Sequence, residues 1–146
     1  MAHEPSGSAK QLHLTVVTPA RKIYDDKATA LVAPAYDGEL GVLPGHANLM
    51  ALLGAGEVRI TQPNGSRKFL AVRGGFLQVS GSTVTVLTPE SVGPEEVDAG
   101  KVDKEIEALK AEQLSDLEKR GAREAKLKWA LTRRKVLDHS KGVSRN

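Results

Sequence analysis

Proline and glycine divide this chain into two parts that must fold differently. All seven prolines and eleven of the 14 glycines lie at or before Pro94. Both residues weaken helices, because proline lacks the amide hydrogen and glycine loses the most backbone entropy on folding. The sequence after Pro94 is rich in Ala, Glu, Lys, Leu and Arg, which have high helix propensity. We therefore predict a body without long helices, followed by a helical tail.

The body has the alternation of a mainly β domain. In the runs 12–17, 57–61 and 83–86, Val, Leu and Ile mostly alternate with polar residues. This period of two places one face of a strand in a core and the other in water. Residues 63–66 read Pro-Asn-Gly-Ser, and Asn-Gly favours a tight hairpin because it accepts positive φ. Many short strands with frequent turns favour a β-sandwich or a barrel.

The tail has the pattern of two short helices. Pro94 can occupy a first helical position, where its missing N–H costs little. Apolar residues then recur at spacings of four and three between residues 102 and 109, which places them on one helix face. Ser115 and Glu118 match the S-x-x-E capping box, so a second helix is predicted to start near Ser115. Helices this short are marginal alone, so we expect a movable tail that packs on itself, on the body or on a partner.

These boundaries give an order for the whole chain. We expect a disordered N-terminus over 1–10, the β domain over 11–90, a linker over 91–93, a two-helix domain over 94–140 and a disordered tail over 141–146. The first ten residues lack the apolar run of a secretory signal, and no run approaches the roughly 18 to 20 apolar residues that span a bilayer. A soluble protein without direct membrane insertion is expected.

Charge separates the two parts of the tail. Residues 1–90 hold 8 Lys and Arg against 7 Asp and Glu, residues 91–116 hold 3 against 8, and residues 117–146 hold 10 against 3. A neutral body, an acidic segment and a basic segment indicate separate roles. The basic segment suits a nucleic-acid-binding module. The adjoining acidic segment and the low aromatic content of 3% argue against that function class.

The sequence offers no catalytic or metal-binding pattern. The glycines between 38 and 45 lack the G-K-[ST] of a phosphate-binding loop. The four histidines (His3, His13, His46 and His139) show no metal-ligand spacing. There is no cysteine to form a disulfide, bind a metal or act as a nucleophile. We therefore expect no catalytic residue, no metal and no enzyme.

The most distinctive segment is the run 37–47, Asp-Gly-Glu-Leu-Gly-Val-Leu-Pro-Gly-His-Ala. It resembles the G-E-[LF]-G-x-x-P-G-H motif of the epsilon subunit of F-type ATP synthases, whose mitochondrial counterpart is the delta subunit. The matching residues are Gly38, Glu39, Leu40, Gly41, Pro44, Gly45 and His46. The run 72–79 resembles the family's G-G-[FIV]-[LV]-x-[VI] hairpin. A stand-alone β-sandwich adaptor with a helical arm shares this architecture but leaves the motif unexplained.

The resemblance implies a fold and a function. The family folds as a ten-stranded β-sandwich followed by a C-terminal α-helical hairpin. Its sandwich binds the gamma subunit and rests on the c-ring, and this rotor subunit helps couple proton or sodium flow to rotary ATP synthesis. The hairpin can extend toward the alpha and beta subunits and inhibit ATP hydrolysis. The resemblance implies a non-catalytic subunit, peripheral at the cytoplasmic face of a bacterial inner membrane, with the chloroplast thylakoid as the alternative.

The motif itself is the first candidate site. Closely spaced Gly and Pro residues predict a protruding loop that faces the c-ring. Glu39 offers an acceptor-only carboxylate that suits Arg or amide donors, and the family uses the glutamate at this place for the ring contact. His46 lies in the same region. It is expected either to face the ring or to satisfy backbone groups within the loop.

The basic segment is the second candidate site. In the family such residues face acidic segments of the beta and gamma subunits, through attraction that salt weakens. The candidates for these inhibitory contacts are Arg123, Lys126, Arg133, Arg134 and Lys135, with Trp129 as an apolar anchor beneath them. The alternative is an ordinary solvated helix face.

ATP binding is a third, weaker expectation, and no other cofactor is implied. Some bacterial relatives bind ATP through an [IL]-D-x-x-R-A motif, and residues 97–102 here read Val-Asp-Ala-Gly-Lys-Val. Asp98 matches, but Lys101 replaces the arginine and loses its planar, two-pronged donor. Asp98 and Lys101 are the candidates if ATP binds, and otherwise they form a helix-surface pair.

Overall fold

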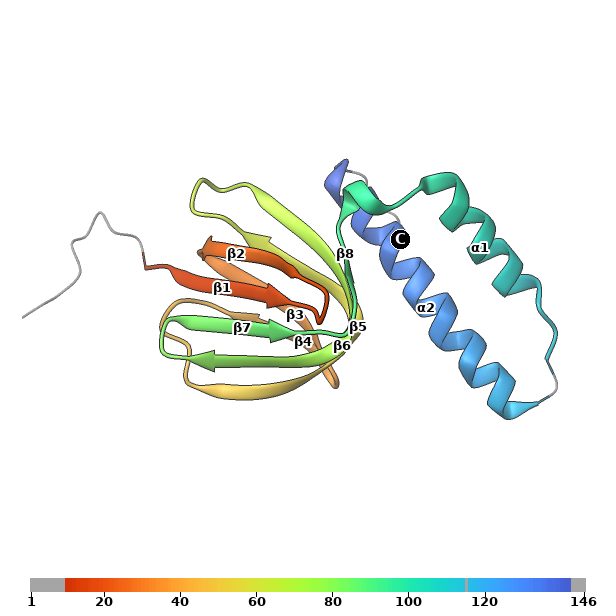
Figure 1. Ribbon diagram of the computed structural model, residues 1–146, viewed down its shortest axis with the longest axis horizontal. Helices are drawn as coiled ribbons and strands as arrows, with labels where there is room; N and C mark the ends of the chain where they lie inside the picture. The colour runs from red at the N-terminus through yellow and green to blue at the C-terminus, as the bar shows by residue number, and fades with distance from the viewer. Residues whose placement is uncertain (1–9, 115, 143–146) are drawn as a thin grey trace, which may run out of the picture.

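The computed structural model describes residues 10–114 and 116–142, which form a β-sandwich with a hairpin of two helices beside it (Figure 1). The predicted fold class is therefore confirmed. Three expectations lie outside the described residues. These are the disordered ends, apart from residues 10, 141 and 142, and the capping role of Ser115.

Eight strands make up the sandwich. They are β1 (Leu12–Val17), β2 (Lys22–Ala28), β3 (Ala30–Ala35), β4 (Gly38–Val42), β5 (Leu49–Thr61), β6 (Arg67–Ser80), β7 (Thr83–Leu87) and β8 (Ser91–Val92). Their order is β2-β1-β7-β6-β5-β3-β4, with β8 paired to β6. The pair of β1 and β7 is parallel, and the other pairs are antiparallel.

The expected ten strands are corrected to eight, because two long strands bend where shorter ones were expected. The pairs Leu53–Gly75 and Ala55–Arg73 of β5 and β6 keep one register, but Gly54 and Gly74 between them are not paired. At this bend Gly74 and Gly75 have φ of 83° and 112°, which glycine adopts without steric cost. A side chain at Gly75 would also place its Cβ 1.9 Å from the Leu87 carbonyl oxygen. Counting each half of β5 and β6 separately gives the ten expected strands.

The core lies between the two layers and consists of inward-facing aliphatic side chains. The predicted alternation is present, since β1 buries Leu12, Leu14 and Val16 while His13 points outward. Fully buried Val or Leu side chains contribute roughly 1.5–3 kcal/mol each. The other core residues from every long strand are Tyr24, Ala28, Leu31, Ala33, Val42, Leu53, Val58, Ile60, Leu70, Val72, Leu77, Val79, Val84 and Val86.

The junction between sandwich and tail is more ordered than a linker. Residues 91–93 were expected to be a linker, but Ser91 and Val92 form β8 and pair with β6. Pro94 does begin a helix, although this is the single 3₁₀ turn η1 (Pro94–Glu96). Arg21, the residue before β2, forms a 2.6 Å ion pair with Glu96 in this turn. The start of the tail is thereby tied to the body.

Two α-helices follow η1 in the described part of the chain. Helix α1 (Ala99–Ala111) begins after the N-cap Asp98, and α2 (Leu117–Ser140) begins after the N-cap Asp116, close to the predicted start. The predicted face of α1 packs against Ala130 and Leu127 of α2 through Val102, Ile106 and Leu109. Helix α2 also packs on β5 and β6, so it lies between α1 and the sandwich (Figure 1).

Candidate functional site

The predicted loop starts later than expected. Gly38–Val42 are not loop but form edge strand β4, paired antiparallel with β3. The reason is that Val42 is fully buried and Leu40 packs against the core, so this segment alternates as a strand. Positive φ values at Gly38 (139°) and Gly45 (90°) mark the turns at either end. Residues 43–48 form the actual loop, which includes Pro44, Gly45 and His46.

Glu39 is exposed on the outer side of this edge strand. Its side chain is 57% exposed, and its two carboxylate oxygens lie 3.2 and 3.3 Å from the guanidinium nitrogens of Arg59. Arg59 belongs to β5 and also reaches Glu57, at 3.7 Å. The Glu39 carboxylate is therefore already paired with Arg59 of its own chain, and a cation from a partner would compete with Arg59 for it.

The loop 43–48 is held by its own backbone. The His46 amide donates to the Leu43 carbonyl at 3.0 Å, and Nδ1 of His46 lies 2.7 Å from the Ala47 carbonyl. The Asn48 side chain accepts from the Gly81 amide at 2.8 Å, which places this loop beside the β6–β7 turn. That turn lies at the end of the sandwich away from the helices (Figure 1). The His46 ring therefore bonds to a backbone carbonyl within the loop, which is one of the two roles expected of it.

An apolar row crosses the outer face of one sheet. Val17 pairs with Leu87, Leu87 with Phe76, and Phe76 with Leu52, so the four residues stand side by side on β1, β7, β6 and β5. Leu52, Phe76 and Leu87 are each about half exposed, at 49%, 51% and 51%. We call these four residues the apolar row. Sequence reasoning missed it, although Phe76 and Leu87 are out of phase with their inward neighbours Leu77 and Val86.

The tail meets the sandwich at Trp129. This side chain is only 5% exposed and packs with Ala71 of β6 and Val136 of α2, with Phe69 and Val92 nearby. Two guanidinium groups, those of Arg73 and Arg133, lie 5.5 and 5.6 Å from its ring. Trp129 is therefore an apolar anchor, but it anchors α2 to the protein's own sandwich.

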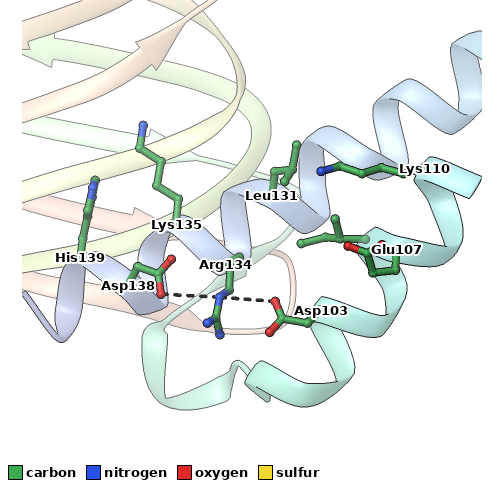
Figure 2. A pocket seen from close by; sticks show the side chains of 9 residues that line it. Asp103, Glu107, Lys110, Leu131, Arg134, Lys135, Asp138 and His139 are labelled. Carbon is green, nitrogen blue, oxygen red and sulfur yellow. Dashed lines mark ion pairs between the residues drawn. The ribbon is translucent and has the colours of Figure 1, made fainter. Parts of the chain in front are cut away.

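The tail arginines are paired inside the hairpin. Arg133 forms a 2.6 Å ion pair with Glu105 of α1, and Arg123 donates to the Glu112 carbonyl at 2.9 Å. Arg134 lies between Asp103 of α1 and Asp138 of α2, at 3.4 and 3.5 Å (Figure 2). The acidic and basic segments thus face each other within the described hairpin. Lys126 and Lys135 are exposed.

A partly buried hydrogen bond between His139 and Glu57 attaches the end of α2 to β5. Nδ1 of His139 lies 2.7 and 3.0 Å from the two carboxylate oxygens of Glu57, whose side chain is 1% exposed. The His139 ring also packs against Phe69, with 5.4 Å between ring centroids. Sequence reasoning placed Glu57 on a water-facing side of its strand. Helix α2 covers that side, which only the tertiary structure reveals.

Asp98 and Lys101 do not form the expected side-chain pair. The Asp98 carboxylate accepts from the Lys101 backbone amide at 3.0 Å and caps α1. The hollow between the helices lies further along, among Asp103, Glu107, Lys110, Leu131 and Lys135 (Figure 2). Neither Asp98 nor Lys101 lines it.

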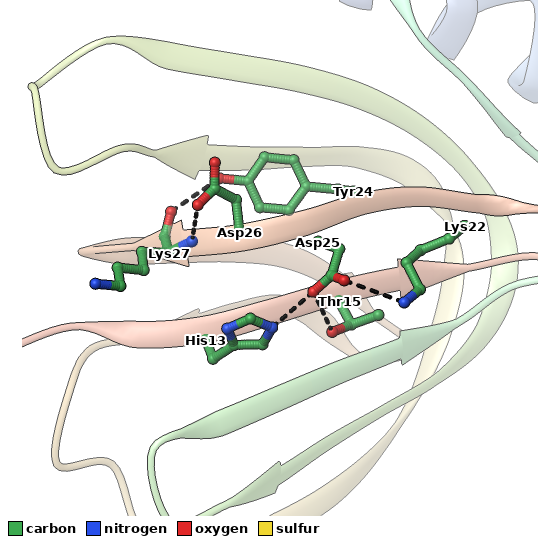
Figure 3. Close-up of polar contacts among 7 residues, drawn as sticks. All are labelled: His13, Thr15, Lys22, Tyr24, Asp25, Asp26 and Lys27. Carbon is green, nitrogen blue, oxygen red and sulfur yellow. Dashed lines mark hydrogen bonds and ion pairs between the residues drawn. The ribbon is translucent and has the colours of Figure 1, made fainter.

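A separate polar cluster lies on the exposed face of β1 and β2. His13 and Lys22 point toward Asp25, with distances of 2.6 and 3.1 Å (Figure 3). The hydrogen bond from Lys22, followed by that from His13, holds the pKa of the Asp25 carboxyl below its usual 3.8. Within residues 10–114 and 116–142, no three His, Asp or Glu side chains gather as a metal site would require.

In the part of the chain that the structure describes, neither helix is long and apolar enough to cross a membrane.

Comparisons with known proteins agree on one family. Residues 11–93 match the family described as ATP synthase, Delta/Epsilon chain, beta-sandwich domain. An ATP synthase epsilon chain of Pelotomaculum thermopropionicum is 42% identical over 66% of this chain and 71% of its own. That of Hyphomonas neptunium is 34% identical over 90% of this chain and 89% of its own.

Solved structures agree with this assignment. A chain of the Euglena gracilis mitochondrial ATP synthase, from a cryo-EM structure of OSCP/F1/c-ring, superposes with a TM-score of 0.77 at 25% identity. It covers 97% of this chain and 89% of its own. A chain of the Tetrahymena thermophila mitochondrial ATP synthase central stalk and c-ring has a TM-score of 0.62. It covers 86% of this chain and 96% of its own, and at 16% identity it supports the fold alone.

Proposed function

The chain belongs to the delta/epsilon family of ATP synthase subunits, and from this premise we propose that it is a non-catalytic rotor subunit of the central stalk. It is similar to a chain of an assembly that contains the c-ring, which supports a place between the catalytic head and the ring. The sandwich, residues 11–93, serves as the docking domain, and the two-helix tail regulates.

The observation that carries the docking role is the apolar row. Its four side chains lie together on one sheet face, and three of them are half exposed while the tail packs on the other face of the sandwich. Contiguous exposed apolar surface marks an interaction site. We assign the gamma subunit to the apolar row, because apolar side chains dominate the buried centre of a lasting interface.

The ring contact is assigned to Glu39 and the loop 43–48. Glu39 is an exposed carboxylate, and Leu43 is an exposed apolar side chain in the adjoining loop. The carboxylate can accept hydrogen bonds from Arg or amide donors of a loop of the membrane-embedded ring. His46 is left as a structural residue of this loop, since its ring bonds to the loop's own backbone.

The tail is proposed to inhibit ATP hydrolysis when it leaves the sandwich. In the hairpin, Arg133 and Arg134 face carboxylates of α1. Nε of Arg123 and Nε of Arg133 are buried without a hydrogen bond among the described residues, so the hairpin satisfies these groups incompletely. An extended tail would present the same arginines to acidic segments of the beta and gamma subunits. ATP binding at Asp98 and Lys101 is not part of the proposal, because the Asp98 carboxylate caps α1.

The proposed location follows from membership of an ATP synthase. An ATP synthase works at a membrane, and this subunit is peripheral to it. We propose the cytoplasmic face of a bacterial inner membrane, because its sequence relatives at 42% and 34% identity are bacterial epsilon chains.

The test is ATP hydrolysis by the alpha-beta-gamma complex, with this chain added whole or cut after Gly93. A cut there keeps β8 in the sheet. We expect both forms to bind and only the whole chain to inhibit. Binding without inhibition by the whole chain would remove the regulatory role, and binding by neither form would remove the docking role.

A further inference from the structure

We propose that Glu39, Arg59, Glu57 and His139 form an ion-pair relay, through which docking at Glu39 loosens the attachment of the helical tail. The four side chains come from β4, β5 and α2, and successive members lie within ion-pair distance. The inference rests on the proposed function in one respect, namely that a partner's cation meets Glu39.

The tail end of the relay depends on the burial of Glu57. A carboxylate with 1% exposure is costly unless donors satisfy it. His139 supplies such a donor, within 3.0 Å of both oxygens. When α2 leaves, Glu57 returns to water and needs no donor. The contact with His139 therefore decides how stable the attached tail is relative to the detached tail.

The middle of the relay is one guanidinium group between two carboxylates. Glu57 and Arg59 are two residues apart on β5, so both point to the same face of the sheet. Arg59 lies 3.2 Å from Glu39 and 3.7 Å from Glu57. In this arrangement Arg59 lies closer to Glu39 than to Glu57, and His139 is the nearer partner of both Glu57 oxygens.

A cation that takes Glu39 would release Arg59 toward Glu57. The guanidinium group would then compete with His139 for the same two oxygens. The attached tail loses part of its stabilisation, although the partner contacts none of its residues. Docking and tail release are thereby coupled through one shared arginine.

The experiment uses the full-length protein without partners. The tail contains the protein's single tryptophan, Trp129, which is buried against the sandwich. Its emission maximum and its quenching by acrylamide report the detached population, and hydrogen exchange of the α2 amides provides a second measurement. Glu39→Gln imitates an occupied Glu39, because the amide no longer holds Arg59.

We expect Glu39→Gln to raise the detached population about threefold, a typical coupling for adjacent charged groups. In an Arg59→Gln background the same substitution should change nothing. Asp37→Asn, an equal charge change at an exposed neighbour, is the matched control and should also change nothing. His139→Gln should raise detachment whether or not Glu39 is present.

Two results would overturn the relay: no effect of Glu39→Gln, or an equal effect in the Arg59→Gln background. If Arg59→Gln disturbs folding, a Glu57→Gln background gives the same test, because it removes the next member. The experiment contains no c-ring, so a negative result would contradict the relay and leave the proposed docking on the ring untouched. Loss of ring docking in the assembled enzyme would instead contradict the proposed function.

Discussion

Single residues set the shape of the sandwich at the point where β6 bends. Gly75 combines a φ of 112° with a backbone oxygen that occupies the place of a side chain. Gly41, in the same motif as Glu39, has neither constraint, since nothing lies within 4 Å of its missing Cβ. Gly75 is therefore required by the backbone conformation and the space around it, whereas Gly41 is not.

Gly75→Ala is expected to destabilise the sandwich by at least about 2 kcal/mol, from strain and from the clash with Leu87. Gly41→Ala is the control and should change stability by less than about 0.5 kcal/mol. Urea unfolding of both variants measures the difference. Equal stability of the two variants would contradict the assigned role of Gly75.

The lowered pKa of Asp25 predicts how stability depends on pH in the acid range. Its folded pKa lies below the usual 3.8, so its contribution to stability is present above 3.8 and is lost as pH falls through the lower folded value. Lys22→Gln should move the pKa of Asp25 back toward 3.8, and His13→Gln should move it less, because the Lys22 contact is the larger cause. An NMR titration of the Asp25 carboxyl measures both. A larger shift from His13→Gln would reverse the order of causes.

At the scale of elements, helix α2 has two faces with different partners. One face packs on β6 through Trp129, and another meets α1 through Arg133 and Arg134. Opening the hairpin and removing the arginines are therefore separate changes. Variants can distinguish an inhibitory arginine from one that only holds the hairpin together.

Charge reversal of Arg133 and Arg134 to Glu should raise ATP hydrolysis by the alpha-beta-gamma complex, because the extended tail loses its attraction to acidic segments. Glu105→Gln weakens the same hairpin but keeps the arginines, so it should lower hydrolysis. Steady-state ATPase rates at equal occupancy by the subunit provide the comparison. Parallel changes in both variants would show that only hairpin opening matters.

The sequence predicts these elements unevenly, for physical reasons. Alternation predicts β1 because one of its faces is in the core, and spacing predicts α1 because one face meets α2. The strand β4 was mistaken for a loop, since its two glycines and the Pro-Gly pair that follows it outweighed two inward side chains. Glu57 and the apolar row were missed because their roles depend on which outer face the tail covers.

At the scale of the whole molecule, the proposed docking residues and the proposed regulatory arginines lie on different parts of one small rotor subunit. The apolar row and Glu39 belong to the sandwich, whereas the arginines belong to the tail. Substitutions that weaken docking should therefore reduce the coupling between proton pumping and ATP hydrolysis in the complete enzyme. It should not appear as a loss of the subunit's own fold.

Glu39→Lys should weaken docking on the ring by about tenfold, because it replaces an exposed interface carboxylate with a like charge beside Arg59. ATP-driven proton pumping in reconstituted vesicles should fall while ATP hydrolysis continues. Asp37→Lys is the matched control for the added charge. Unchanged pumping with Glu39→Lys would rule out this contact.

The parallel pairing of β1 with β7 affects how the protein is made. The first strand of the sheet lies between β2 and a strand that ends at Leu87, so its second neighbour is synthesised much later. Contacts between residues far apart in sequence form slowly, and an edge left open in the meantime favours aggregation. On the ribosome, β1 must wait for residues 83–87 to emerge. The helical tail is synthesised after these residues. The sandwich therefore has time to pair β1 with β7 before the chain is released.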